Sequence, residues 1–236
     1  MPLFRKDSHP YIVTKRRFKV IFMGKYQLGK SLIINALLNN YSCEIGSGLE
    51  TTKRISKAGT FGNFDIYDSP GVGGDLLSYE DAIVEARSFD FVIFICKDKQ
   101  LDKFELKFLR DLTNEEILHS IIFNVNCDKY DEDDQRETEE IISAIISQKT
   151  EIGDSAIPVF DREILCVKPH FLPNIGKLSN GKIFTPIEER GRVSIEKSGI
   201  AQLRNFLGKP KGASLDLSDY LSIYIEIRKY ANGNMG

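Results

Sequence analysis

The sequence predicts an α/β protein in which helices cover both faces of a mostly parallel central sheet. Short apolar runs typical of strands alternate along the chain with stretches whose apolar residues recur at helical spacing. This alternation is typical of parallel sheets whose strands are connected by helices. In addition, Phe91–Cys96 is a continuous apolar run, as expected for a central strand that is buried on both faces.

The expected elements follow from these patterns. The strand candidates are short apolar or alternating runs: Phe18–Met23, Arg54–Phe61, Phe64–Asp68, Phe91–Cys96, Ile121–Cys127 and Ile164–Val167. A Gly62-Asn63 turn joins the second of these to the third. The helix candidates carry an apolar stripe: Lys30–Asn39, the stretch from Phe104 to Leu112, and the stretch from Ile141 to Ile146.

Changes in composition divide the chain into an arm, a main domain and a tail. We expect residues 1–14 to form an N-terminal arm, 15–207 the main domain and 208–236 a C-terminal tail element. Residues 168–197 contain Pro, Gly and a Ser179-Asn180-Gly181 turn, which favours an elaborated loop or hairpin. The tail from Asp216 to Tyr230 fits both a strand and a helix, and we favour the helix.

Composition argues against several classes of protein. The 236 residues have a net charge of −2, which excludes a strongly basic polyanion binder and a highly acidic disordered chain. The four cysteines form no CxxC pair, which argues against a disulfide scaffold and a zinc module. No apolar run approaches the ~20 residues of a membrane helix. A cytoplasmic globular protein is expected.

A phosphate-binding loop is predicted at residues 24–31, because GKYQLGKS matches G-x-x-x-x-G-K-[ST] between a strand and a helix. The N–H groups of such a loop and of the following helix surround the β-phosphate of a nucleotide. Lys30 would bridge the β- and γ-phosphates, and the Ser31 hydroxyl would bind Mg²⁺. The expected nucleotide-binding residues here are Gly24, Gln27, Leu28, Gly29, Lys30, Ser31 and Leu32.

Two further segments are expected to contact the metal and the γ-phosphate. Asp68 ends a strand and opens the run DSPG, so its carboxylate would accept from a Mg²⁺-bound water and the Gly71 N–H would bond the γ-phosphate. The polar segment Tyr41–Thr52 ends in Thr51-Thr52. We favour Thr52 as a ligand of Mg²⁺ and a sensor of the γ-phosphate. The competing interpretations are an aspartate that caps a turn and the start of a strand.

Base recognition is predicted in the run DKYD at residues 128–131. The Asp131 carboxylate would accept from guanine N1–H and N2–H₂, the Lys129 stem would pack along the ring, and Val167 would lie where a second loop touches the base. The competing interpretation is an acidic surface helix, because Asp128–Glu140 contains eight acidic and two basic residues.

These motifs, in this order, resemble the translation-factor-like P-loop GTPases, most closely the Era, TrmE and septin branch. The likeness rests on GKYQLGKS, LIINALL, ETTK, DSPG and DKYD, and it covers about Lys19–Val167. Ser198–Leu207 is similar to the last helix of that branch's G domain. The resemblance implies a three-layer G domain and a Mg²⁺-dependent GTP switch with slow hydrolysis, which acts on RNA, ribosomes, membranes or other G domains. Interferon-induced and dynamin-like GTPases share these broad features.

Several positions depart from the family pattern. Asp128 stands where the base motif usually has Asn, and Gln27 stands where potassium-activated members carry Asn. Val72 follows the glycine of DSPG, where Ras-like enzymes place the glutamine that orients the attacking water. A valine cannot hydrogen-bond water, so we expect catalysis to draw on another residue, an activating protein or a second G domain in a homodimer.

The predicted function is GTP binding with slow Mg²⁺-dependent hydrolysis to GDP and phosphate, as a nucleotide-controlled switch. The catalytic candidates are Lys30, Thr52 and Gly71, and the metal ligands are Ser31, Thr52 and Asp68. One alternative is a nucleotide-dependent assembly module with little or no hydrolysis, which Val72 and Asp128 favour. A small-molecule kinase would share the phosphate loop but would not need DSPG or DKYD. RNA or a membrane surface as partner has no support in the residues themselves.

Overall fold

Strands and helices alternate through the described part of the chain, in a computed structural model that describes residues 16–45, 52–97, 102–124, 165–167, 177–178, 199–208, 217–219, 221–222 and 225. The elements are β1 (Phe18–Gly24), α1 (Lys30–Leu38), β2 (Glu44–Ile45), β3 (Ser56–Phe61), β4 (Phe64–Asp68), α2 (Tyr79–Ala86), β5 (Phe91–Lys97), α3 (Lys103–Asn114), β6 (His119–Asn124), β7 (Leu165–Val167), β8 (Lys177–Leu178) and α5 (Ile200–Leu207).

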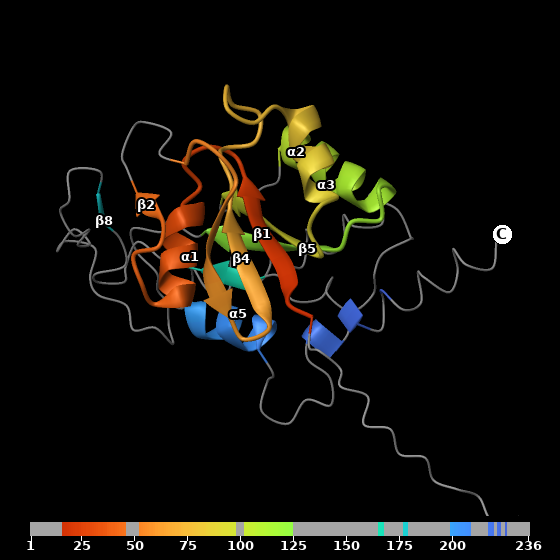
Figure 1. Ribbon diagram of the computed structural model, residues 1–236. Coiled ribbons are helices and arrows are strands. Elements are labelled where there is room, and N and C mark those ends of the chain that lie inside the picture. The colour runs from red at the N-terminus through yellow and green to blue at the C-terminus, as the bar shows by residue number, and fades with distance from the viewer. Residues whose placement is uncertain are drawn as a thin grey trace, which may run out of the picture.

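The central sheet has six strands in the order β3-β4-β1-β5-β6-β7. Figure 1 shows β1 beside β4. All neighbours are parallel except β3, which pairs antiparallel with β4. The mostly parallel α/β fold is therefore confirmed. Strand β1 lies between β4 and β5, with Phe22 opposite Asp68 and Gly24 opposite Ile95. This register places the phosphate loop, which follows β1, beside the carboxyl end of β4.

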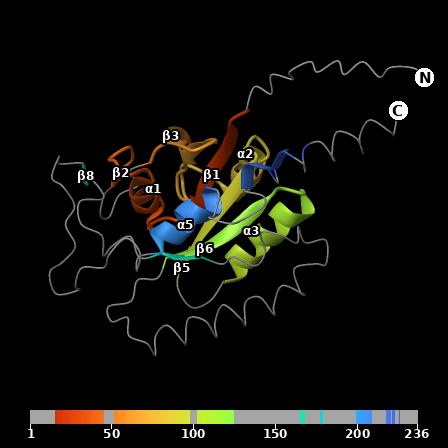
Figure 2. The same ribbon diagram turned by 90° about the horizontal axis from the view of Figure 1, so that it is seen from below.

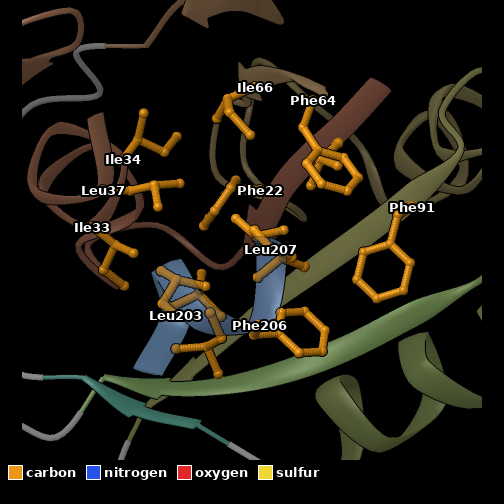
Figure 3. Packing of buried hydrophobic residues seen from close by; sticks show 14 of the residues in the cluster. Phe22, Ile33, Ile34, Leu37, Phe64, Ile66, Phe91, Leu203, Phe206 and Leu207 are labelled. Carbon is orange, nitrogen blue, oxygen red and sulfur yellow. The ribbon is translucent and has the colours of Figure 1, made fainter. Parts of the chain in front are cut away.

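Helices cover both faces of the sheet, because the residues of its central strands alternate between two apolar clusters. Val20 and Phe22 of β1 pack with α1 and α5, whereas Ile21 and Met23 pack with α2 and α3. Figure 2 shows the sheet between the two pairs of helices. In the first cluster, aromatic and aliphatic side chains from β1, β4, β5, α1 and α5 meet (Figure 3). Each such buried side chain stabilises the fold by about 1.5–3 kcal/mol.

Some bounds differ from the sequence prediction. Strand β6 begins at His119 rather than Ile121, because His119 and Ser120 already pair with Val92 and Ile93 of β5. Strand β3 begins at Ser56 rather than Arg54. Helix α2 was not expected; Ser78 caps it by accepting a hydrogen bond from Asp81 N at 3.1 Å.

Some of the expected elements lie outside the described residues. The expected arm, residues 1–14, and the expected helix from Ile141 to Ile146 are both outside them. The expected last helix of the domain is present as α5. The described tail residues are helical, as favoured, and Leu217 and Leu221 pack into the cluster of α1 and α5. Within the described residues, no helix has both the length and the apolar character needed to cross a membrane.

A single arginine joins α5 to the end of α1, which leads to a stability prediction. Arg204 Nε and Nη2 donate to Leu37 O at 3.1 Å and Ala36 O at 2.9 Å, which are carbonyls of the last helical turn that have no partner within the helix. Arg204→Met should lower the free energy of unfolding by about 1.5–3 kcal/mol, the range for hydrogen bonds to charged groups.

Urea unfolding measures this loss, and Arg87→Met is the matched control. Arg87 pairs with Glu115, and 51% and 40% of the two side chains are exposed, so its loss should cost less than about 1 kcal/mol. Equal effects of the two substitutions would contradict the assignment of Arg204 as the cap of α1.

Candidate functional site

The conformation of the phosphate loop requires a glycine at its first position. Gly24 has φ +146°, and a Cβ there would lie 2.4 Å from the Ile95 carbonyl oxygen of β5. Only glycine fits so close to a neighbouring backbone. The loop ends at Gly29, from which α1 starts. Residues 24–31 therefore form the predicted strand–loop–helix unit.

Lys30 places its ammonium group over this loop. Its Nζ donates to Gly24 O at 3.1 Å and to Lys25 O at 2.9 Å, although only 7% of the residue is exposed. The side chains of Leu28 and Leu32 pack in the core, so any contact of these two residues with a nucleotide falls to their backbone. Gln27 is exposed.

The expected metal ligands meet at the ends of three different segments. Ser31 Oγ and Thr52 Oγ1 both donate to Asp68 Oδ2, at 2.7 Å and 3.0 Å, and lie 3.4 Å from each other. Two hydroxyls and a carboxylate are the oxygen donors that Mg²⁺ prefers. Within the described residues, no group of three His, Cys, Asp or Glu could hold a metal. The three oxygen donors fit Mg²⁺.

Asp68 is a buried carboxyl group with 2% of the residue exposed. Burial raises its pKa, while the Ser31 hydrogen bond, the Lys30 charge and the Thr52 hydrogen bond lower it. Cys43 also donates to Asp68, and burial, followed by the Asp68 charge, raises the pKa of this thiol. Cys43 therefore stays a neutral donor. Burial has the larger effect, so the pKa of Asp68 is raised overall, and its neighbours oppose part of that rise.

The segment that leads to Thr52 is held near its beginning by α1. The buried Asn35 side chain donates to Cys43 O and accepts from Cys43 N, both at 2.8 Å. Strand β2 follows directly and pairs in parallel with β8 in a separate two-stranded sheet. Residues 46–51, including Thr51, lie outside the described residues. Within the described part it is Thr52, the favoured threonine, that reaches Asp68.

Gly71 and Val72 lie against the phosphate loop. A Cβ on Gly71 would be 2.8 Å from both N and Cα of Tyr26, and the Val72 N–H donates to Gly24 O at 3.0 Å. The Val72 side chain is 3% exposed and packs in the cluster of α2 and α3. It therefore presents no polar group to the site.

The close approach of Gly71 to Tyr26 leads to a second prediction. Gly71→Ala should force these two backbones apart and move the Gly71 N–H, because a Cβ is not tolerated within 3.0 Å of backbone atoms. If this N–H bonds the γ-phosphate, affinity for GTP should fall about ten-fold further than affinity for GDP, because GTP alone loses one hydrogen bond to a charged group.

Titrations with fluorescent GTP and GDP analogues measure the two affinities. Gly62→Ala is the control for backbone strain: Gly62 has φ +55°, which an alanine adopts only with strain, but no atom lies within 4 Å of an added Cβ there. An equal loss of GTP and GDP affinity in Gly71→Ala would contradict a specific contact with the γ-phosphate.

Comparison with known proteins assigns the chain to a family. Residues 19–151, more than half of the chain, match the model described as 50S ribosome-binding GTPase. The chain belongs to this family. The expected resemblance to the translation-factor-like P-loop GTPases is thereby confirmed, and the chain carries a GTPase domain. No curated protein matches the chain.

Solved structures of GTPases are similar to the chain at low identity. Era of Aquifex aeolicus bound to GDP·AlF4⁻ has 18% identity and a TM-score of 0.49, over 65% of this chain and 52% of that one. Era in complex with MgGDPNP and a 16S ribosomal RNA fragment has 16% identity and a TM-score of 0.49, over 65% and 51%. SelB of Methanococcus maripaludis has 16% identity and a TM-score of 0.44, over 65% and 30%. The chain spans about half the length of the two Era chains.

The structure of this GTPase domain brings together part of the predicted site. The phosphate loop, Ser31, Thr52, Asp68 and Gly71 lie next to one another. Lys129 and Asp131, the expected base-binding residues, lie outside the described residues. Val167 ends β7, opposite Asn124 of β6. The sequence analysis did not single out Asn35 or Cys43. LIINALL contains the asparagine, but the direction of its side chain follows only from its position on the helix.

Proposed function

We propose that this chain is a GTP-dependent switch that hydrolyses GTP slowly with Mg²⁺. The observation that carries the proposal is the convergence of Ser31, Thr52 and Asp68 on one point beside the Lys30 loop. Separate segments of the chain supply these three oxygens, and hydroxyl and carboxylate oxygens are ligands that Mg²⁺ prefers.

The residues of the chain would divide the work as follows. The loop N–H groups and the Lys30 ammonium bind the phosphates, and Lys30 exchanges two carbonyl partners for phosphate oxygens. Ser31 and Thr52 would hold the metal directly, and Asp68 through a water. Mg²⁺, when bound, neutralises the charge that develops between the β- and γ-phosphates.

The switch would consist of the segments that end in Thr52 and start at Asp68. Thr52 and the Gly71 N–H are the groups that would contact the γ-phosphate, so its loss would release both segments. Asn35 and β8 hold the chain at Cys43–Ile45. This restraint would keep Cys43–Ile45 in place when the γ-phosphate is lost.

Guanine would be selected by Asp131 and Lys129, with Val167 at the second loop. These assignments rest on the DKYD run and on its position after β6. Asp128 in place of Asn removes an amide from this loop, and we expect it to weaken the base contact without changing its specificity.

Val72 supports a second candidate function, a nucleotide-dependent assembly module with little hydrolysis. Its side chain is buried in the core, so a water-orienting group must come from elsewhere: another residue, an activating protein or a homodimer.

The family description names the 50S ribosome, and on that ground alone we propose a ribosome or RNA as partner. A cytoplasmic location stays a prediction from the sequence.

Turnover distinguishes the switch from the assembly module. Intrinsic phosphate release should be detectable but far below the ~1–100 s⁻¹ typical of kinases, because Val72 cannot orient water. It should rise with protein concentration if a second G domain completes the site. The Lys30→Ala protein gives the background of contaminating activity. Fast, concentration-independent turnover at nanomolar protein would contradict the claim that this chain lacks a water-orienting group. Turnover at the background rate would favour the assembly module.

A further inference from the structure

Lys25, the second residue of the phosphate loop, is joined to the start of α3. Its Nζ donates to Asp102 Oδ2, lies 4.0 Å from Glu105 Oε1 and lies 5.2 Å from the centroid of the Phe104 ring. An ammonium group within about 6 Å of an aromatic face is attracted to it. The lysine is thus held by one acidic, aromatic helix start.

The two carboxylate oxygens of Asp102 have separate partners. Oδ1 accepts from Phe104 N and Glu105 N, both at 3.0 Å, while Glu105 Oε2 accepts from Asp102 N at 3.0 Å. This capping box fixes the beginning of α3. Oδ2 accepts a hydrogen bond from Lys25 Nζ, and this bond is the main reason why the pKa of Asp102 is lowered. The carboxylate is therefore charged at neutral pH.

The backbone of Lys25 faces the expected phosphate site. Its carbonyl oxygen accepts from Lys30 Nζ at 2.9 Å, and the neighbouring Gly24 carbonyl accepts from both Lys30 and Val72. The Phe104 ring also touches the segment after Asp68, because a Cβ on Gly73 would lie 3.0 Å from its Cε2. Lys25 therefore contacts α3 through its side chain and the phosphate-binding Lys30 through its backbone.

We propose that Lys25 is a positioning residue for the nucleotide, because its ion pair with Asp102 fixes the first turn of the phosphate loop on α3. This inference rests on the proposed function. A loop that is already fixed loses less conformational freedom when the phosphates bind, and affinity is higher for that reason. Lys25 need not touch the phosphates itself.

A simple charge effect predicts a different result, and Asp102→Asn separates the two. Asparagine keeps the Oδ1 that caps α3, and it is as good an N-cap as aspartate. Its amide group places a donor where Lys25 needs an acceptor. Without the negative charge, phosphate affinity should rise if charge alone matters. It should fall if the anchor matters.

The test is a titration with a fluorescent GDP analogue in the presence of Mg²⁺. Lys25→Met and Asp102→Asn should each weaken binding about five-fold, the upper limit for a partly exposed ion pair. The double variant should bind no more weakly than Lys25→Met, because both changes remove one interaction. Lys25→Arg should keep most of the affinity.

Lys107→Met is the matched control. Lys107 lies on the same helix, pairs with Asp111 at 3.0 Å and sits 3.8 Å from the centroid of the Tyr79 ring, but it has no contact with the phosphate loop among the described interactions. Its substitution should leave GDP affinity unchanged. Urea unfolding midpoints of Asp102→Asn and the parent should agree, which separates positioning from a general loss of stability.

Two outcomes would overturn different claims. If the parent binds the analogue and Asp102→Asn binds it equally well or more tightly, Lys25 is not a positioning residue and the proposed function stands. If the parent itself binds no guanine nucleotide, the proposed function is wrong and this inference falls with it.

Discussion

Lys30→Ala should abolish tight binding of GTP and GDP. Lys30 is 7% exposed and its ammonium group donates to two loop carbonyls, so its exchange for phosphate oxygens costs little extra desolvation. Removing one partner of a buried charge pair typically costs about 2–5 kcal/mol. We therefore expect binding to weaken by roughly 10²–10³-fold, measured by titration with a fluorescent GTP analogue.

Lys57→Ala is the matched control for this substitution. Lys57 lies in β3, 44% of its side chain is exposed, and it pairs with Asp65 at 3.0 Å, away from the phosphate loop. The Lys57→Ala protein should bind the GTP analogue with the affinity of the parent. Parent-like affinity in Lys30→Ala as well would show that residues 24–31 are not the phosphate site.

Asp131→Asn should shift specificity from guanine to xanthine nucleotides. The change turns an acceptor for guanine N2–H₂ into a donor, which meets a donor in GTP but the C2 carbonyl in xanthosine triphosphate. A site built to hydrogen-bond a group typically rejects a mismatched analogue by ~10⁴-fold or more. Competition between the two triphosphates for a fluorescent analogue measures the shift, and Asp128 could reduce its size without reversing its direction.

Asp133→Asn is the control, because Asp133 lies in the same acidic run. It should leave the preference unchanged. If Asp131→Asn also binds GTP like the parent and gains nothing for xanthosine triphosphate, then DKYD is the start of an acidic helix. The guanine assignment would be wrong, and a generic phosphate-loop nucleoside triphosphatase would remain.

Local patterns were sufficient to predict the sheet and several of the residues that lie together beside the loop after β1. Continuous apolar runs such as Phe91–Cys96 indicate buried parallel strands in any context, and β5 has those bounds to within one residue. The spacing of Gly24, Lys30 and Ser31 predicted a loop between a strand and a helix, and β1 and α1 flank these residues. The convergence of Ser31 with Asp68 followed from the order of adjacent parallel strands.

Features that depend on distant partners could not be predicted. Helix α2 has a weak apolar signal, because Ala82 and Ala86 supply two of its buried positions. Strand β2 is two residues long and is defined by its pairing with β8. Lys25 and Asp102 are 77 residues apart along the chain, and each alone has the pattern of an ordinary surface charge.

The central claim is that one site binds a guanine nucleotide through Lys30, Mg²⁺ and a base-specific loop. Competition against a fluorescent GTP analogue, with Mg²⁺ and again with EDTA, tests it most directly. We expect GTP and GDP to displace the analogue, ATP to compete at least ~10²-fold less well, and chelation of Mg²⁺ to weaken GTP binding. Displacement by ATP as readily as by GTP, or binding of GTP that is indifferent to Mg²⁺, would contradict the account.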